Sequence, residues 1–298
     1  MEIRQLEAFA ILSECLSVTR TAERLFCTQP AVSISIRKLE ESLNTTLFER
    51  TNNRLRLTPQ GRTYREYVLQ ILSLAKQSQE HMRLFDHPES GSINIGASHF
   101  CGVWVLPSVI AQFNKKYPNI TIRLDIDKTG QLLQKLNVHD VDFVVISDYI
   151  NVSSEKNTLM YLMDDPFVLI CHPQHKLASK KICTQEELKS ETFLIKPQHS
   201  TTRMFMDKCF SMCGIQLGNL IEIDSLEGIK QGVIHGLGVS VVPARSVSQE
   251  IRTGLLSEVV LPNVAISRRI NSVQHKDKLS SPAAQLFLTE IKNSLTEW

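Results

Sequence analysis

Residues 28–39 read Thr28-Gln29-Pro30-Ala31-Val32-Ser33-Ile34-Ser35-Ile36-Arg37-Lys38-Leu39, and this stretch decides the fold of the first part of the chain. Thr28 is a residue type that caps helix N-termini, and Pro30 stands in the first turn, where its missing N–H is harmless. Apolar residues at 32, 36 and 39 recur at helical spacing and predict one buried face. Another face carries Gln29, Ser33 and Arg37, whose donors and acceptors suit base edges and phosphates. The stretch therefore predicts a DNA recognition helix.

The residues in front of this helix predict a second, shorter helix. Ser17 is a suitable N-cap, apolar residues at 18, 22 and 25 would face inward, and only Phe26-Cys27 separate the two helices. Two short helices across a tight turn form a helix-turn-helix. A first helix over about residues 2–15 is expected to pack behind it, because its apolar residues also recur at helical spacing.

A small hairpin, or wing, is expected after the recognition helix. Residues 47–50 and 54–57 flank a turn at Asn52-Asn53, and the second segment alternates strictly between arginine and leucine. Arg54 and Arg56 therefore share one side of their strand. Five arginines and no acid stand between residues 50 and 65, which places a basic strip beside the recognition helix. Simple exposure to solvent is the alternative explanation for the two wing arginines.

The expected DNA contacts are divided between bases and phosphates. Gln29 and Ser33 lie on the first turns and should read base edges, whereas arginines should contact phosphates. Because Glu40 and Glu41 would repel phosphates at the other end of the helix, the N-terminal half should enter the groove. The residues expected to bind DNA are Thr28, Gln29, Pro30, Ser33, Ile34, Arg37, Arg50, Arg54 and Arg56.

A long helix is expected to begin at Thr58-Pro59 and to run for about 27 residues, or roughly 40 Å. Its apolar residues recur at intervals of four and three, which is the pattern of a helix-to-helix seam. Such a helix is too long for a small winged domain to bury, so a second copy of the chain should cover it; burial within its own chain is the alternative. The expected dimer contacts are Tyr64, Val68, Ile71, Ala75 and Met82. Residues 85–92, rich in Pro, Gly and Ser, should end the helix as a linker.

Composition excludes several protein classes. A chain of 298 residues with 42% hydrophobic and 21% charged residues is long enough for two or three globular domains, and the net charge of +2 is too small to indicate nucleic acid by itself. The start of the chain lacks the apolar core of a signal peptide, and no run has membrane-spanning length, so we expect a cytoplasmic protein without a membrane partner. Seven scattered cysteines fit reduced thiols better than a disulfide framework.

From Ser92 onward the pattern changes to strands alternating with helices, which predicts an α/β domain. The expected strands are 92–96, 120–124, 143–146, 167–170 and 192–195. The expected helices are 103–117, 131–136, 202–213 and 225–235. Sequence alone indicates this alternation but not how the strands cross between subdomains.

These motifs together resemble those of LysR-type transcriptional regulators. The resemblance rests on residues 29–33, 39–40, 47–50 and 57–61 in the first part, and on Gly96-Ala97-Ser98, Leu106-Pro107, Asp142-Phe143 and 236–239 after the linker. It covers essentially the whole chain. Ile34 and Ser35 depart from it, because the family often places longer polar side chains there.

The resemblance implies a winged helix-turn-helix at 1–58, a linker and dimerisation helix with a hinge at 59–91, and an effector-binding domain at 92–298. The last would be two-lobed and similar to periplasmic binding proteins, with one lobe at about 92–165 and 266–298 and the other at about 166–265. The implied function is sequence-specific regulation of transcription, as activator or repressor, by a homodimer or homotetramer on double-stranded promoter DNA. RNA polymerase is an implied partner, and no cofactor is expected.

The effector implied by the resemblance is a small, anionic metabolite. Loops after the predicted strands are rich in hydroxyls and precede helix N-termini, whose free N–H groups suit a carboxylate, phosphate or sulfate. Ordinary helix capping by the same hydroxyls is the alternative. The expected effector-binding residues are Ser98, His99, Phe100, Thr129, Ser147, His199, Ser200, Thr201 and Thr202.

Other chemistry is less well supported by the sequence. Ser98 and His99 are adjacent, so their side chains diverge and no third partner completes a catalytic set, which argues against an enzyme. The stretch 171–175 contains a cysteine and two histidines but also a turn proline, which disfavours a metal site. Two alternatives remain: a redox-sensing regulator that uses Cys209 and Cys213, and a solute-binding protein, for which residues 1–65 would have no use.

Overall fold

The computed structural model describes the chain except for residues 52–53, 85–89, 148–151, 263, 279 and 297–298. It forms two compact units that both draw on distant parts of the sequence. The first unit comprises Met1–Gly96, Phe113–Val144 and Gln274–Leu288, and the second comprises Ala97–Gln112, Val145–Val273 and Thr289–Trp298. In the part of the chain that is described, no helix is long and apolar enough to cross a membrane.

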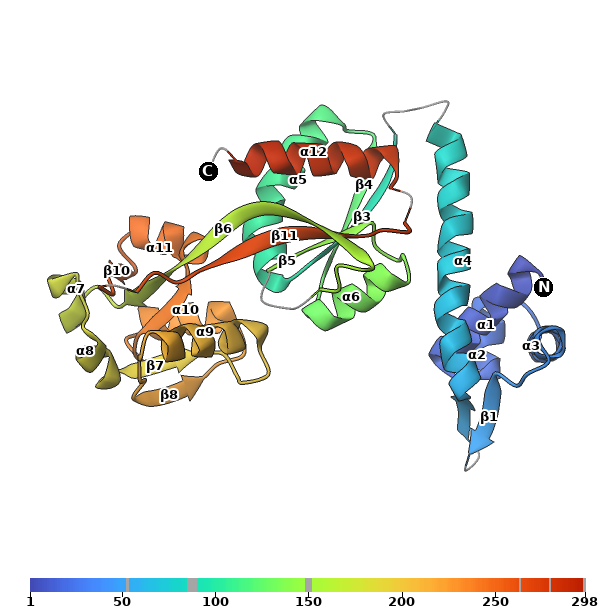
Figure 1. Ribbon diagram of the computed structural model, residues 1–298, viewed down its shortest axis with the longest axis horizontal. Helices are drawn as coiled ribbons and strands as arrows, with labels where there is room; N and C mark the ends of the chain where they lie inside the picture. Colours follow the sequence, from blue (N-terminus) through green and yellow to red (C-terminus); the bar gives the residue numbers. More distant parts are fainter. Residues whose placement is uncertain (52–53, 85–89, 148–151, 263, 279, 297–298) are drawn as a thin grey trace. The chain divides into compact units, whose positions relative to one another are not determined.

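The first unit begins with the expected helix-turn-helix (Figure 1). Its helices are α1 (Ile3–Cys15), α2 (Val18–Arg24) and α3 (Gln29–Leu43). The hydroxyl of Ser17 accepts a hydrogen bond from the Arg20 N–H, and that of Thr28 accepts one from the Ala31 N–H. These two caps fix where α2 and α3 start. Their apolar faces meet α1 in one core that contains Phe9, Ala22, Val32, Ile36 and Leu39.

The wing is a two-stranded hairpin of β1 (Phe48–Thr51) and β2 (Arg54–Leu57). The predicted turn at Asn52-Asn53 lies outside the described residues. Gly61, in the first turn of the next helix, lies against the start of the wing. A Cβ atom at this position would stand 2.1 Å from the carbonyl oxygen of Leu47, so only glycine permits the close approach.

The long helix α4 runs over Pro59–Leu84, close to the predicted length. The Thr58 hydroxyl accepts a hydrogen bond from the Gly61 N–H at 2.9 Å and donates one to the Thr46 carbonyl at 2.8 Å. Thr58 thereby caps α4 and fastens it to the chain just before the wing. The predicted linker after this helix lies largely outside the described residues.

The rest of the first unit is an α/β layer. Strands β5 (Phe143–Ser147), β3 (Gly91–Ala97) and β4 (Ile120–Ile126) lie side by side in that order. Helix α6 (Thr129–Asn137) belongs to the same unit, and α5 (Leu106–Lys116) and α12 (Pro282–Thr296) each contribute one part to it. The Phe113 ring packs edge-on against Phe287 at 4.9 Å, which joins these two helices.

His139, just after α6, is a histidine held in an unfavourable position for its charged form. Its backbone is left-handed (φ 59°), and its ring packs edge-on against His275 at 4.9 Å. Burial, then the nearby His275 and Lys278, lower the pKa of His139 from 6.5 to about 4. Its Nδ1 is buried and has no hydrogen-bond partner among the described residues.

We expect His139→Asn to reduce the acid sensitivity of the fold. Between pH 6.5 and pH 4 the unfolded chain binds a proton that folded His139 does not, so stability is lost as the pH falls through this window. The loss from this group should be on the order of 1–2 kcal/mol at pH 5 relative to pH 7.5. Asparagine removes the titration and tolerates a positive φ.

Denaturant unfolding at pH 5 and pH 7.5 measures this difference for the wild type and the variant. His235→Asn, at an exposed histidine that ends α10, is the matched control. An unchanged difference between the two pH values in His139→Asn would contradict this role of His139.

The second unit is built around the long strand β6 (Asn157–Cys171). It lies between β10 (Ser257–Val259) and β11 (Ser267–His275), and it also pairs with β9 (Ser240–Pro243). A separate pair is formed by β7 (Thr192–Ile195) and β8 (Asn219–Glu222). The helices are η1 (Cys101–Val105, a π-helix), α7 (Lys176–Lys180), α8 (Gln185–Lys189), α9 (Thr201–Met212), α10 (Leu226–Ile234), η2 (Ala244–Val247) and α11 (Ser248–Arg252).

The structure differs from the sequence prediction in the crossing strands. The prediction began a strand at 167, but β6 begins ten residues earlier, at Asn157. Acidic residues 164 and 165 hid the first half, because charged residues are uncommon in buried strands. The short strands β8, β9 and β10 and the strand β11 were also missed. The predicted helix over 103–117 is a π-helical turn followed by α5.

Candidate DNA interface and effector pocket

The recognition helix α3 presents the predicted face to solvent. Gln29, Ser33 and Arg37 are exposed, as are Thr28 and Pro30, and Ile34 keeps 55% of its surface accessible. The Arg37 Nε donates to the Glu41 carboxylate at 2.9 Å, an exposed pair that costs little to open. The face is therefore available to a partner, and Ile34 adds an apolar group suited to a thymine methyl.

Glu40 has a role that the sequence argument did not foresee. Its carboxylate accepts hydrogen bonds from the N–H groups of Leu47 at 2.6 Å and Phe48 at 3.2 Å. Glu40 thus fastens the wing to the recognition helix. The prediction that Glu40 faces phosphates is wrong, because two N–H groups of its own domain hold its carboxylate. Glu41 is exposed, and its repulsion of phosphates stays a prediction.

The wing arginines do not all share one face. Residues directly opposite in an antiparallel pair point to the same side, and the register places Arg54 opposite Thr51 and Arg56 opposite Glu49. Arg50 lies opposite Leu55 and so belongs to the other side of the hairpin. All three arginines are exposed. The sequence prediction of a shared side holds for Arg54 and Arg56.

The predicted dimer seam on α4 divides into two parts. Val68 is fully buried in the core of its own winged domain, and the Tyr64 ring packs edge-on against Phe9 at 5.3 Å. Val68 is therefore not available to a second chain, as the alternative of burial within the chain required. Ala75 is half-buried, whereas Ile71 and Met82 are exposed. Among the α4 residues whose exposure the structure describes, the exposed large apolar ones are Tyr67, Ile71, Leu74 and Met82.

A small pocket in the second unit, called the inner pocket, gathers three of the predicted effector residues. Its volume is about 80 Å³. Its polar lining residues are His99, Lys196, Thr202, Arg203, Ser240 and Arg268, and the ring of Phe100 adds an apolar wall. Sequence reasoning found His99, Phe100 and Thr202 but none of the cations.

Arg268 of β11 is the most constrained of these cations. Its guanidinium carbon lies 5.2 Å from the centre of the Phe100 ring and 5.0 Å from that of Phe167. In the plane of the guanidinium, Nε donates to Asp165 Oδ2 at 2.7 Å and Nη1 donates to Thr202 Oγ1 at 3.2 Å. The guanidinium therefore lies over two aromatic rings, while its N–H groups donate hydrogen bonds to Asp165 and Thr202.

The other two cations of the pocket, Arg203 and Lys196, form hydrogen bonds with other groups of the protein. Arg203 Nε donates to both carboxylate oxygens of Asp207, and its Nη1 donates to Glu222 and to the Lys196 carbonyl. Lys196 itself bonds the Asp224 carbonyl. These pairs fix the shape of the pocket wall.

The N-terminus of α9 borders the same pocket through Thr202. Ser200 is its N-cap, but the Ser200 hydroxyl makes no capping hydrogen bond. Ordinary helix capping, the alternative explanation for these hydroxyls, therefore does not account for Ser200. Thr201 is half-buried and His199 is exposed. Ser98 and Ser147 are half-buried, and Ser98 hydrogen-bonds Cys101. Thr129 belongs to the first unit, where it is the buried first residue of α6.

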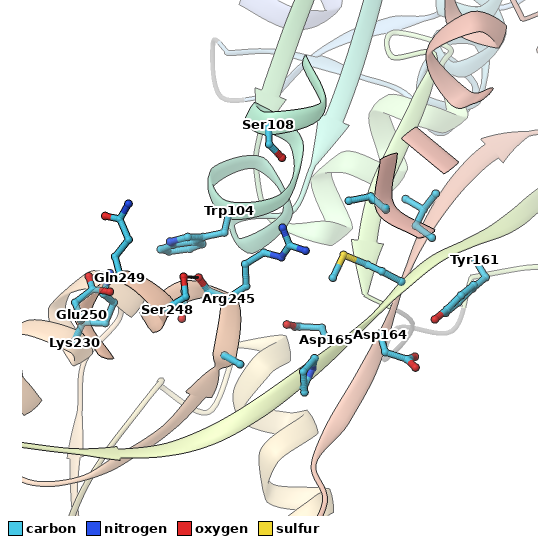
Figure 2. Close-up of a pocket in the computed structure, with 16 residues that line it drawn as sticks. Trp104, Ser108, Tyr161, Asp164, Asp165, Lys230, Arg245, Ser248, Gln249 and Glu250 are labelled. Carbon is cyan, nitrogen blue, oxygen red and sulfur yellow. Dashed lines mark hydrogen bonds and ion pairs between the residues drawn. The ribbon is translucent and has the colours of Figure 1, made fainter. Parts of the chain in front are cut away.

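A larger hollow, called the outer cavity, also lies within the second unit. Its volume is about 1020 Å³, and its lining includes Trp104, Asp165, Lys230, Arg245 and Glu250. Lys230 is bound by Glu250 at 2.6 Å, and Figure 2 shows Arg245 between Trp104 and Asp165. Sequence reasoning named no residue of this cavity. Asp165 lines the outer cavity and Arg268 lines the inner pocket, so their ion pair forms part of the wall between them.

A period of two in the sequence could have revealed Arg268. Residues 266, 268 and 270 are buried, whereas 267 and 269 are exposed. An arginine that shares a face with Ile266 and Ile270 must be buried, and buried arginines are paired. The same alternation places Asp165 on the buried side of β6 with Phe167.

Two family profiles match the chain. Residues 3–62 match a bacterial regulatory helix-turn-helix protein of the lysR family, and residues 86–296 match a LysR substrate binding domain. The chain belongs to the LysR family of transcription regulators. The fold class expected from the sequence is thereby confirmed, and this LysR-type protein is a regulator rather than an enzyme.

Known proteins resemble this LysR-type regulator over nearly its full length. A RuBisCO operon transcriptional regulator of Allochromatium vinosum is 31% identical over 96% of this chain and 94% of its own. A full-length OxyR from Pseudomonas aeruginosa, with one cysteine replaced by aspartate, has the same fold, with a TM-score of 0.74 and 23% identity over 99% of this chain and 94% of its own. Full-length CbnR in complex with its target DNA gives a TM-score of 0.68 and 21% identity over 99% of this chain and 100% of its own.

Burial works against one of the two cysteines named in the redox alternative. Cys209 on α9 and Cys213 at its C-cap are both half-buried, and burial raises the pKa of Cys209, which disfavours its thiolate. Cys171 is fully buried, and the ring of nearby His175 caps α7. Among the described residues, no group of three His, Cys, Asp or Glu side chains is arranged to hold a metal ion.

Proposed function

We propose that this LysR-type regulator binds promoter DNA through α3 and the wing, and that a small anionic metabolite in the inner pocket modulates this binding. The observation that carries the proposal is Arg268, a buried guanidinium at a pocket that Thr202 and the N-terminus of α9 also border. A buried cation, a hydroxyl and free helix N–H groups are the donors that bind carboxylates, phosphates and sulfates.

The exposed side chains of α3 and of the wing are the groups that we expect to contact DNA. Gln29 and Ser33 contact base edges, Ile34 contacts a thymine methyl, and Arg37, Arg50, Arg54 and Arg56 contact phosphates. Thr28 and Pro30 stand beside them at the start of α3. A homodimer formed through the exposed stripe of α4 supplies two recognition helices, and RNA polymerase is the partner on which the bound regulator acts.

The regulated genes are proposed by analogy with the relatives. Proteins similar to this chain are named regulators of RuBisCO or of its operon, at 28–31% identity. Identity at this level supports a regulator that answers to a metabolite of carbon fixation. It does not carry over the operator sequence, because those contacts depend on a few side chains of α3.

Binding of the effector is expected to depend on Thr202. Thr202→Val removes the hydroxyl that contacts Arg268 while keeping the shape of the side chain, so affinity for the effector should fall about fivefold, equivalent to one hydrogen bond. Ser98→Ala and Thr201→Val should each cost less, because the hydrogen bonds that the structure describes for Arg268 go to Asp165 and Thr202.

The measurement has two steps. Thermal-shift screening of carboxylates, phosphates and sulfur oxyanions on the full chain identifies the effector, and calorimetry then compares variants. Thr253→Val, whose hydroxyl donates only to backbone carbonyls at the end of α11, is the control. If Thr202→Val and Thr253→Val bind the effector equally well, the inner pocket is not the effector site.

A further inference from the structure

The ion pair between Asp165 and Arg268 is incomplete. Asp165 is 1% exposed, and only its Oδ2 is hydrogen-bonded, while Oδ1 is buried with no partner among the described residues. A carboxylate can accept two parallel bonds from one guanidinium, and such bidentate pairs are the strong ones. Desolvation outweighs the attraction of Arg268 and raises the pKa of Asp165, as expected for a buried pair that does not fully repay its burial.

The guanidinium of Arg268 is held in place by groups other than Asp165. Its carbon lies over the rings of Phe100 and Phe167, and Thr202 accepts a hydrogen bond from Nη1. The guanidinium would therefore keep its position if the carboxylate left. An oxyanion in the inner pocket would meet a cation that is already oriented, which lowers the cost of binding.

Asp165 also has a second cation near it. Arg245, on the outer cavity, favours the charged form of Asp165. Figure 2 shows the carboxylate of Asp165 on the side of β6 toward Arg245. A carboxylate released from Arg268 would thus move toward a positive charge and not into an apolar space.

Building on the proposed effector site, we propose that Asp165 occupies Arg268 as an internal stand-in for the effector, and that an incoming oxyanion displaces it toward Arg245. In this exchange the oxyanion takes the edge of Arg268 that Asp165 held, and the carboxylate of Asp165 turns to Arg245. The strands that carry this pair are β6 and β11, so occupancy of the inner pocket changes the wall of the outer cavity.

Calorimetry of the full chain with sulfate tests the proposal, because sulfate keeps its charge of two over the working pH range. Asp165→Asn removes the competitor, so sulfate should bind at least tenfold more tightly than to the wild type. Asp207→Asn is the control. It makes the same change in net charge at Arg203, another buried arginine of the inner pocket, and should alter sulfate affinity less than twofold.

A second pair of variants tests where the carboxylate goes. Arg245→Gln should weaken sulfate binding about threefold in the wild type, because released Asp165 loses its new partner. The same substitution should have no effect in the Asp165→Asn background, where there is no carboxylate to receive. Equal losses in both backgrounds would show that Arg245 acts only through its charge and would overturn the exchange.

The outcomes separate this proposal from the proposed function. Sulfate binding by the wild type that Asp165→Asn leaves unchanged would overturn the competition while leaving the effector site intact. Equal tightening by Asp165→Asn and Asp207→Asn would also overturn it, since net charge alone would explain the result. If neither the wild type nor a folded Asp165→Asn binds sulfate or the effector found by screening, both proposals fail. If Asp207→Asn is unstable, the two Arg245→Gln proteins, one in the wild-type and one in the Asp165→Asn background, still test whether Asp165 moves to Arg245.

Discussion

Ile71→Asp is expected to convert the protein into a monomer that no longer binds its operator. Ile71 lies in the exposed apolar stripe of α4, between Tyr67 and Leu74. An aspartate there would place a charge in the proposed dimer seam, and an unpaired buried charge costs several kcal/mol. Two recognition helices at fixed separation are needed to read two half-sites, so operator affinity should fall by at least about a hundredfold.

The choice of Ile71 follows from burial in the single chain. Val68 belongs to the core of the winged domain, so a charge at that position would unfold the domain without testing the dimer. Ile71 is 38% exposed, and its replacement leaves that core intact. Circular dichroism should therefore show a folded protein.

Light scattering measures the molar mass of the variant, and fluorescence anisotropy measures its operator affinity. Lys76→Asp is the control, because it adds an acid at an exposed position on another side of α4. A dimeric Ile71→Asp protein would show that the subunits associate elsewhere.

Gln29→Ala is expected to weaken binding to the operator by about 1–3 kcal/mol and to leave binding to random DNA nearly unchanged. Gln29 is the first residue of α3 and is exposed, so its amide can form two hydrogen bonds with one base. Random sequences rarely offer the matching edge, and their binding depends on phosphates.

Arg54→Ala provides the contrast. Arg54 is exposed on the wing, and its guanidinium can reach phosphate but is far along the chain from the helix that reads bases. The variant should bind operator and random DNA more weakly by similar factors. The slope of the logarithm of its binding constant against the logarithm of the salt concentration should become shallower by about one. Titrations of both DNAs at two salt concentrations give these values. Equal loss by Gln29→Ala on both DNAs would sink its assignment to base readout.

The winged domain could be predicted closely because its signals are local. Thr28, Pro30 and the apolar positions of α3 act within a few residues of one another, and the structure uses each of them as expected. Glu40 shows the limit of this reasoning. Its partners Leu47 and Phe48 lie seven and eight residues away across a loop, and nothing in the helical pattern distinguishes a carboxylate that binds backbone from one that faces solvent.

The inner pocket was predicted only in part, because it forms from distant segments. Hydroxyls and helix starts mark His99, Phe100 and Thr202 in the sequence, and all three line the inner pocket. Asp165 and Arg268 are separated by 103 residues, and their pairing depends on strands whose crossing the sequence does not reveal. The alternation of residues in β11 shows that Arg268 is buried but not which carboxylate it meets.

The bond from Glu40 to the start of the wing has a consequence for engineering. A designer who wants to give this protein a new operator would transplant the recognition surface from a relative. Because Glu40 joins α3 to the backbone at 47 and 48, a graft that ends at residue 39 keeps the host's own wing anchored, whereas one that extends past it exchanges the anchor as well. The DNA-contacting segment that can be exchanged without disturbing the wing therefore ends between residues 39 and 40.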